Sequence, residues 1–303
     1  MILKGLIQMK EITKALLGRL GLLIYMSKLK KRVRCYTAAE HRLVKEAFAN
    51  HFREDVKPVL IWTSHKSASS LISRLFKSLR SKNLVRYYDY ETQPTRYGNV
   101  SNAGDLNEIL ETQQRILFSE PGAIYGPLRH PYNITDASNY RHIIFLRDPR
   151  DVAVSAYYWF RDHSAIPDHK FWADAALERR RHLHSIGVGE YSLDAANDWL
   201  IPLYTHLRDL KESGAEVFFI SYDEFRADTR RVLADAVDFS LGSLTPKQLM
   251  AVEDFCSELV VKPRSAHRRS GASGQFYAGM SVEEVERLSE ALGEVLLYWG
   301  FDN

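Results

Sequence analysis

The sequence predicts an α/β fold in which helices flank a parallel β-sheet. Apolar runs of strand length recur along the chain, and most are followed by apolar residues at helical spacing. Strands that alternate with helices in this way pair in parallel, because each helix crosses back over the sheet. The first strand and helix are joined by a short loop with several hydroxyl side chains and one lysine.

The expected elements can be placed in order along the chain. Strands are expected at 58–63, 84–88, 122–126, 142–147 and 216–222, and helices at 69–81, 105–118, 149–162 and within 167–212. The run from Val59 to Trp62 is apolar without interruption, which is typical of a strand buried on both faces. A closing helix is expected from Ser281 to Trp299, since Ser281 and Glu284 have the spacing of a capping box.

The loop after the first strand has the properties of an anion-binding site. It reads Ser64-His65-Lys66-Ser67-Ala68-Ser69-Ser70, and we expect Ser69 or Ser70 to be the N-cap of the next helix. Free backbone N–H groups and the helix dipole favour an anion there. Lys66 adds a cation, and Ser67, Ser69 and Ser70 add hydroxyl donors. Because the glycines of a Walker A motif are absent, a plain helix cap with a solvated lysine stays open as the alternative.

A second polar segment follows the strand expected at 142–147. Arg147 lies at the carboxyl end of that strand, where ligands bind in open α/β sheets. Pro149 suits the first turn of the helix that follows, and Ser155 lies two turns further along. Arginine can hold two phosphate oxygens at once, so Arg147 and Ser155 suit a phosphate. The alternative is a structural ion pair between Arg147 and Asp148 or Asp151.

Together these segments resemble the sulfotransferase family, whose members transfer a sulfuryl group from 3′-phosphoadenosine 5′-phosphosulfate (PAPS). Residues 64–70 resemble the 5′-phosphosulfate loop Tyr-Pro-Lys-Ser-Gly-Thr-Thr, and Arg147 and Ser155 have the spacing of the 3′-phosphate motif. The segment Arg269-Ser270-Gly271-Ala-Ser-Gly274-Gln-Phe276 resembles the family's Arg-Lys-Gly-x-x-Gly-Asp-Trp. This chain departs from those patterns at a few positions, which are His65 for proline, Ala68 for glycine, Leu71 for tryptophan and Ser270 for lysine.

The resemblance implies a P-loop-type sulfotransferase domain over residues 55–303, behind an N-terminal helical extension over 1–54. It implies PAPS as donor, 3′-phosphoadenosine 5′-phosphate (PAP) as product, and no metal. The 5′-phosphate would be bound by Lys66, Ser67, Ser69 and Ser70, and the 3′-phosphate by Arg147, Ser155, Arg269 and Gly271. Lys66 would also stabilise the leaving phosphate as a catalytic residue, and Tyr222 would lie near the adenine.

A catalytic base is needed to take the proton of the acceptor hydroxyl. Many family members use a histidine after the strand that precedes the arginine-bearing strand, and here His130 follows that strand. His130 is therefore the expected base, although it lies several residues farther on than the family's histidine. The other candidates are Glu91, Glu111 and His65.

The composition limits the classes of function that this chain can have. A chain of 303 residues with 45% apolar residues can bury one large core. A net charge of +3 suits an anionic donor but does not predict nucleic-acid binding. Its two cysteines, Cys35 and Cys256, form no metal-binding spacing, which favours a reducing, cytoplasmic location. We expect a small-molecule or carbohydrate acceptor that the sequence does not identify.

Two questions stay open at this stage. The apolar and basic N-terminal segment either lies on an anionic membrane surface, which would be peripheral membrane contact, or packs on the catalytic domain or a partner. The competing functions are a P-loop small-molecule kinase and a non-catalytic nucleotide-binding or membrane-associated module of the same fold. A kinase would need Mg²⁺ to bridge its phosphates.

Overall fold

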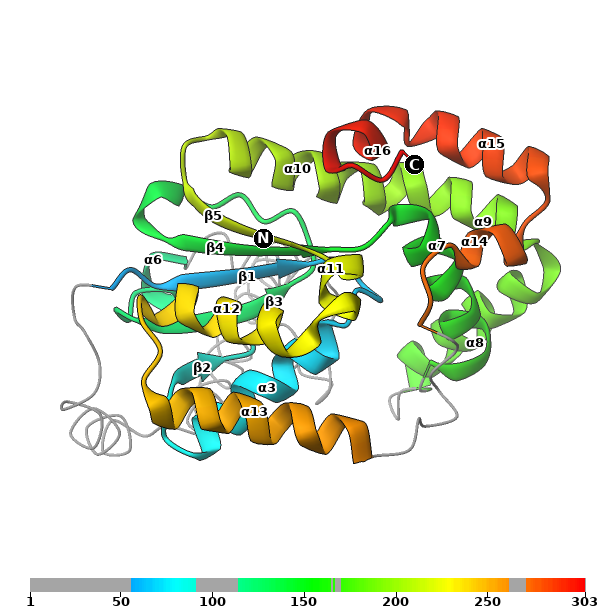
Figure 1. Cartoon of the computed structure of the whole chain (residues 1–303). Coiled ribbons are helices and arrows are strands. Elements are labelled where there is room, and N and C mark those ends of the chain that lie inside the picture. The colour runs from blue at the N-terminus through cyan, green and yellow to red at the C-terminus, as the bar shows by residue number, and fades with distance from the viewer. Residues whose placement is uncertain (1–55, 91–113, 165, 167–169, 262–270, 303) are drawn as a thin grey trace, which may run out of the picture. The chain divides into compact units, whose positions relative to one another are not determined.

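The computed structural model describes residues 56–90, 114–164, 166, 170–261 and 271–302 (Figure 1). Its sheet has five strands, all parallel, in the order β2-β3-β1-β4-β5. The strands are β1 (Val59–Thr63), β2 (Arg86–Tyr88), β3 (Ala123–Leu128), β4 (Arg141–Leu146) and β5 (Glu216–Ser221). The predicted parallel α/β fold is thereby confirmed. The expected extension over 1–54 lies outside the described residues.

The helices follow the strands as expected, with some additions. Their bounds are α3 (Ser69–Ser81), α6 (Gln114–Leu117), α7 (Pro149–Tyr158), α8 (Lys170–Ser185), α9 (Val188–Ala195), α10 (Ile201–Glu212), α11 (Tyr222–Ala227), α12 (Thr229–Leu241), α13 (Pro246–Val261), α14 (Gln275–Gly279), α15 (Val282–Ala291) and α16 (Gly293–Trp299). A short 3₁₀ turn η1 (Ala137–Asn139) and two π-helical segments, η2 (Trp159–His163) and η3 (Ala196–Leu200), complete the set. Helices α12 and α13 were not expected from the sequence.

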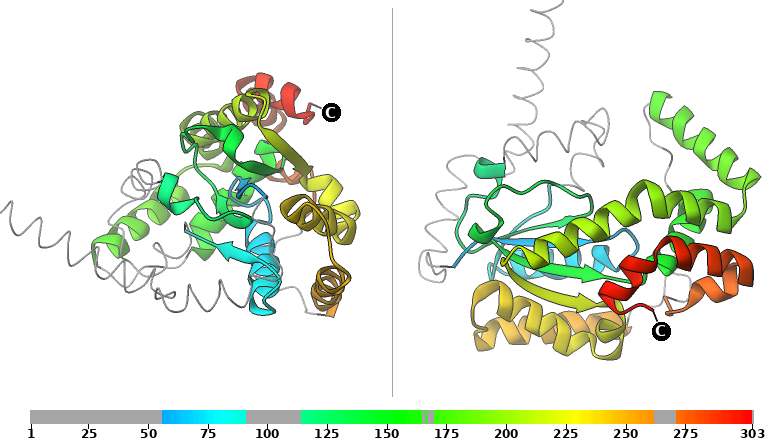
Figure 2. Two further views of the ribbon diagram at one scale, coloured as in Figure 1. Left: turned by 90° about the vertical axis from the view of Figure 1, so that its left-hand side faces the viewer. Right: turned by 90° about the horizontal axis from the view of Figure 1, so that it is seen from above.

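Both faces of the sheet are covered by helices, which makes three layers. Along β1, Leu60 and Trp62 point into one core cluster with α10, α15 and α16, whereas Val59 and Ile61 point into another with α3, α12 and α13. Figure 1 shows these two groups of helices above and below the sheet, and the turned views of Figure 2 agree. Because β1 is buried on both faces, all five of its residues are apolar or fully enclosed.

The structure corrects several expected boundaries. Strand β2 begins at Arg86, β3 continues to Leu128, and the closing helix expected over 281–299 is divided into α15 and α16. The N-cap of α3 is Ala68 in a left-handed conformation, and neither Ser69 nor Ser70 caps the helix through its side chain. The helix expected over 149–162 ends at Tyr158 and continues as the π-helical η2. The expected capping box of Ser281 and Glu284 is confirmed at the start of α15.

A glycine lets β3 approach the central strand closely. Gly126 has φ 132°, and a Cβ there would lie 2.6 Å from the carbonyl oxygen of Ile61. The β1–β3 register shifts at this point, between Leu60 and Trp62. Gly126 therefore determines the path of the chain just before the segment that carries His130.

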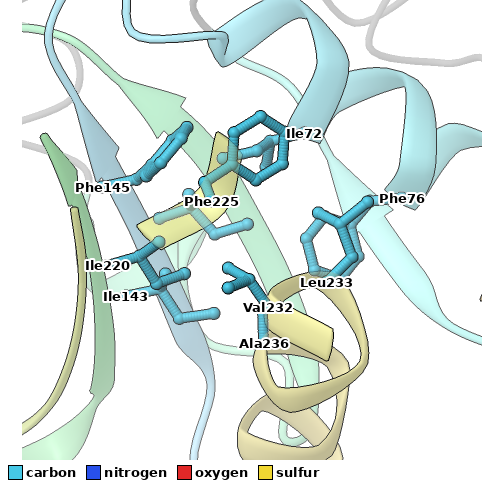
Figure 3. Close-up of a pocket in the computed structure, with 10 residues that line it drawn as sticks. Ile72, Phe76, Ile143, Phe145, Ile220, Phe225, Val232, Leu233 and Ala236 are labelled. Carbon is cyan, nitrogen blue, oxygen red and sulfur yellow. The ribbon is translucent and has the colours of Figure 1, made fainter. Parts of the chain in front are cut away.

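A small gap remains in the core between the sheet and helices α3 and α12 (Figure 3). Its volume is about 10 Å³ and every lining side chain is apolar, among them Ile61, Phe76 and Phe225. A buried water needs polar partners, and none lines this gap. We therefore interpret it as a packing gap with no functional role.

Candidate functional site

The candidate site lies where three neighbouring strands end. Strand β4 pairs with β1 on one side and with β5 on the other. The loop containing Lys66 follows β1, Arg147 follows β4, and Tyr222 follows β5. Because the carboxyl ends of parallel strands lie at one edge of the sheet, these residues meet although they are far apart in sequence.

The backbone of the first loop turns sharply before α3. Lys66 has φ 65° and Ala68 has φ 58°, so both residues are in the left-handed region. That conformation explains why the resembled family has glycine at the position of Ala68. The backbone N–H groups of Ser69 and Ser70, in the first turn of α3, have no acceptor among the described residues. They remain available to an anion.

A buried tyrosine on α10 holds the loop through hydrogen bonds. The Tyr204 hydroxyl donates to the carbonyl oxygen of Arg147 at 2.5 Å and lies 3.3 Å from the Ser64 hydroxyl. The hydroxyls of Ser64 and Ser67 are hydrogen-bonded to each other. Ser67 is fully buried in this contact, so its side chain holds the loop together. Its predicted role as a donor to the phosphate has no direct support in this geometry.

The side chain of Lys66 extends toward α7 and its π-helical continuation. Its Nζ lies 5.1 Å from the centre of the Trp159 ring, which is within the range of a cation–π contact. Burial, with a smaller contribution from the nearby Arg147 charge, lowers the pKa of the Lys66 ammonium to about 8. Lys66 is thus a partly desolvated cation at the mouth of the loop.

Arg129 brings a second cation to the loop, which the sequence reasoning missed. Its Nε donates to the Ser69 hydroxyl at 3.3 Å. Arg129 follows β3 directly, and β3 pairs with β1. The available signal was its place beside His130 at the end of a buried strand, the same kind of position that identified Arg147.

Arg147 is the best-connected residue of the site. Its side chain is almost fully buried, and its Nη2 donates to Asp151 Oδ2 at 3.1 Å and to the Ala272 carbonyl at 2.7 Å. Nη1 donates to the Lys66 carbonyl at 3.4 Å. The ion pair with Asp151, one of the two sequence alternatives, is therefore present, and the contacts to both loops exist beside it.

One donor of Arg147 is left over. Its Nε is buried without a hydrogen-bond partner in the described part of the chain. Buried donors are normally paired because an unpaired one loses its hydration without compensation. An anion bound beside the guanidinium would satisfy this Nε.

Tyr222 and the glycine loop complete the wall around Arg147. The guanidinium carbon lies 4.6 Å from the centre of the Tyr222 ring, and the Tyr222 hydroxyl donates to the Gly271 carbonyl at 3.1 Å. Gly271 has φ 58°, a left-handed conformation that favours glycine. Three of the predicted site residues, Arg147, Tyr222 and Gly271, are therefore brought together. Arg269 lies outside the described residues.

Ser155 is not brought into contact with Arg147. It is half-buried in the second half of α7, and its hydroxyl makes no hydrogen bond to any described residue. Its place on α7, next to the segment that holds Trp159, keeps it on the helix that begins at the site. Its predicted contact with a phosphate stays a prediction.

The candidate bases lie on the β1 and β3 sides. The His130 ring is half-buried after β3, with its centre 5.9 Å from that of His65 and 5.9 Å from that of Tyr132. Burial, followed by the Arg129 and His130 charges, lowers the pKa of His65 to about 3. The ring of Trp199 packs against that of His65, with 5.8 Å between the ring centres. Glu91 and Glu111 lie outside the described residues.

Two further observations concern metal binding and membrane spanning. Within the ranges that the structure describes, no group of three or more His, Cys, Asp or Glu residues is placed to hold a metal ion. No helix in those ranges is both long enough and apolar enough to span a bilayer.

Comparison with known proteins adds a family and a fold. A family model described as a sulfotransferase domain matches residues 131–299, which begins after the Lys66 loop. A mouse sulfotransferase solved with PAP is 16% identical, with a TM-score of 0.50 over 81% of this chain and 85% of that one. A retinol dehydratase solved with retinol and PAP is also 16% identical, with a TM-score of 0.39 over 84% and 86%. No curated protein sequence matches.

Proposed function

The chain belongs to the sulfotransferase domain family, and from that premise we propose that it transfers a sulfuryl group from PAPS to a hydroxyl or amine of an acceptor. The observation that carries the choice of donor is the convergence on Arg147. Its guanidinium contacts the loop after β1, the Tyr222 ring and the Ala272 carbonyl. One cation thus joins the three segments that resemble the family's nucleotide site. The mouse sulfotransferase of similar fold was solved with PAP.

The donor nucleotide would be held at both of its phosphate ends. We assign the 5′-phosphosulfate to the first turn of α3, where the N–H groups of Ser69 and Ser70 have no acceptor among the described residues and Arg129 donates to the Ser69 hydroxyl. We assign the 3′-phosphate to Arg147, whose buried Nε has no partner within the described segments, together with the backbone near Gly271. PAPS has a 3′-phosphate and ATP has none. The 3′-phosphate site at Arg147 would therefore give the selectivity for PAPS over ATP.

Lys66 would act on the bond that breaks. In sulfuryl transfer the bond between sulfur and the bridging phosphate oxygen breaks, a bond from the acceptor oxygen to sulfur forms, and PAP leaves with the negative charge. A cation beside the bridging oxygen stabilises that charge as it develops. Lys66 is the cation of the loop with a lowered pKa, and at a pH below about 8 it is mostly protonated and can serve this role.

The acceptor proton requires a base, for which we propose His130. His65 is a poor candidate, because a pKa of about 3 makes its imidazole a weak base at neutral pH. The ring of His130 packs against the ring of His65. Because His65 directly precedes Lys66, His130 lies next to the Lys66 loop. A base at that position would receive the proton that the acceptor oxygen loses.

The acceptor would enter beside aromatic rings. Trp159, against Lys66, is 36% exposed, whereas Tyr157 is buried with its hydroxyl bonded to the carbonyls of Leu183 and Ile186. Trp199 is half-buried beside His65. Two partly exposed indole rings near the reacting groups suit an apolar small molecule or a sugar ring, which packs well on such surfaces.

Titration calorimetry with PAP, in the absence of magnesium, tests the donor assignment. The matched ligands are 5′-AMP, which lacks the 3′-phosphate, and ATP with Mg²⁺. We expect PAP to bind at least tenfold more tightly than 5′-AMP, and Arg147→Ala to abolish that difference. Equal binding of PAP and 5′-AMP, or tighter binding of Mg²⁺–ATP, would refute the assignment and favour a kinase-like function.

A further inference from the structure

Asp151 is a buried carboxylate that the roles above leave unused. It lies in the first turn of α7 and is fully inaccessible to solvent. Acidic residues are common at this position because they complement the helix dipole. That general role needs neither full burial nor specific partners, and Asp151 has both.

Three donors hydrogen-bond to this carboxylate, and they come from two segments that are far from each other in sequence. Oδ2 accepts from Arg147 Nη2 at 3.1 Å and from the Gly274 N–H at 3.0 Å. Oδ1 accepts from the Phe276 N–H at 3.2 Å. Gly274 and Phe276 are more than 120 residues away in sequence, so Asp151 ties the start of α7 to the loop around α14.

Arg147 and the loop also contact each other directly. The Nη2 that donates to Asp151 donates to the Ala272 carbonyl at 2.7 Å as well. The guanidinium, the carboxylate and the loop over 271–276 therefore form one closed set of hydrogen bonds. A change in one member is expected to alter the position of the others.

We propose that Asp151 is a positioning residue that fixes Arg147 and the loop 271–276 relative to each other, so that both present their donors to one phosphate. This inference rests on the proposed function, because it concerns the 3′-phosphate of the donor. Asp151 touches neither the nucleotide nor the acceptor in this scheme. It acts by holding the residue and the backbone that do.

Asp151→Asn tests the proposal because it changes the hydrogen-bonding pattern and almost nothing else. An amide has one acceptor oxygen and an NH₂ group that only donates. In the variant that NH₂ group would face either Arg147 Nη2 or a peptide N–H, all of which are donors. At least one of the three contacts must therefore break.

Asp148→Asn is the matched control. Asp148 is the N-cap of the same helix, and its ion-pair partner is Arg150. Both variants lose one buried negative charge within the same turn, and both are expected to unfold at a lower temperature. Only Asp151→Asn should alter the selectivity for the 3′-phosphate.

Two measurements decide the proposal. In calorimetry, we expect Asp151→Asn to weaken PAP binding about tenfold or more and 5′-AMP binding less than twofold, while Asp148→Asn keeps the wild-type ratio. In ligand-free hydrogen exchange, we expect a peptide covering 271–276 to exchange faster in Asp151→Asn than in Asp148→Asn.

The outcomes separate this proposal from the proposed function. If wild-type protein does not prefer PAP over 5′-AMP, the donor assignment fails, and the exchange experiment alone decides whether Asp151 holds the loop. If wild type prefers PAP and Asp151→Asn keeps that preference, or weakens both nucleotides equally, the positioning role is refuted. Unchanged exchange in the loop would refute it as well.

Discussion

The start of α7 contains two buried arginine–aspartate pairs that can be compared directly. Arg147 pairs with Asp151, and Arg150 pairs with Asp148. All three side-chain nitrogens of Arg150 donate, to Asp148, to the Ser289 hydroxyl and to the Phe301 carbonyl. Arg147 instead keeps a buried Nε without a partner in the described ranges.

The difference separates a pair whose arginine is fully hydrogen-bonded within the protein from a pair whose arginine keeps one donor for the ligand that we propose. The guanidinium of Arg150 also lies 4.3 Å from the centre of the Phe276 ring. Its nitrogens are hydrogen-bonded, and one face of the guanidinium packs on an aromatic ring. Such a group joins α7 to the C-terminal helices. Arg147 has the same charge and the same burial, yet it retains a donor. The unpartnered Nε supports a ligand at Arg147 because this guanidinium also contacts the loop after β1 and the Ala272 carbonyl.

The largest expected effect is on stability, and it should separate the two arginines. Arg150→Ala leaves Asp148 buried without its cation, and breaking such a pair costs about 3–5 kcal/mol of unfolding free energy. Arg147→Ala should cost less unfolding free energy, because the Asp151 carboxylate keeps two other donors, the N–H groups of Gly274 and Phe276. Urea denaturation of both variants, without nucleotide, measures this. A smaller loss for Arg150→Ala than for Arg147→Ala would contradict the comparison.

A second test uses the protonation of Lys66. Unprotonated lysine reacts with acetic anhydride, so the labelling rate of Lys66 should rise with pH around a midpoint of about 8, well below the ordinary lysine value of about 10.4. Removing the Arg147 charge in Arg147→Gln should move that midpoint to higher pH, since this charge is one cause of the lowered pKa.

Arg150→Lys is the control for that experiment, because Arg150 is not among the causes of the Lys66 shift. Mass spectrometry of the labelled peptide gives the midpoint in each variant. The same midpoint in Arg147→Gln and wild type would show that burial alone lowers the pKa.

The smallest expected effect concerns Ala68. Its left-handed φ of 58° disfavours a side chain, whereas glycine adopts it freely but loses more entropy on folding. We expect Ala68→Gly to raise the unfolding free energy by about 1 kcal/mol or less. Thermal unfolding beside Ala153→Gly, an α7 helix variant that should be destabilised, measures the change. A loss of stability at Ala68→Gly would contradict the strained backbone.

The positions of the strands along the chain could be predicted because each has a local signature. The apolar runs at β1 and β4 and the polar residues that follow them are continuous in sequence, so the sheet and the positions of Lys66 and Arg147 were expected. Helices α12 and α13 were missed, although their buried residues such as Val232 and Phe255 recur at helical spacing. The N-cap was misplaced because serine is the common cap, and the left-handed turn at Ala68 leaves no sequence signal.

The positioning role that we propose for Asp151 could not be predicted by the same means. Next to Pro149 it is an ordinary first-turn acid, and its partners Gly274 and Phe276 follow from tertiary structure alone. The choice between ion pair and phosphate site for Arg147 was likewise undecided in sequence. The structure shows that the ion pair does not use up the donors of the guanidinium.

Gly126 limits how the proposed acceptor side of the enzyme can be redesigned. Any other residue there would place its Cβ 2.6 Å from the Ile61 carbonyl, inside the sheet. A substitution would have to separate β1 from β3, and it would carry Arg129 and His130 away from the Lys66 loop together. Libraries aimed at new acceptors should therefore vary the exposed indoles and leave position 126 unchanged.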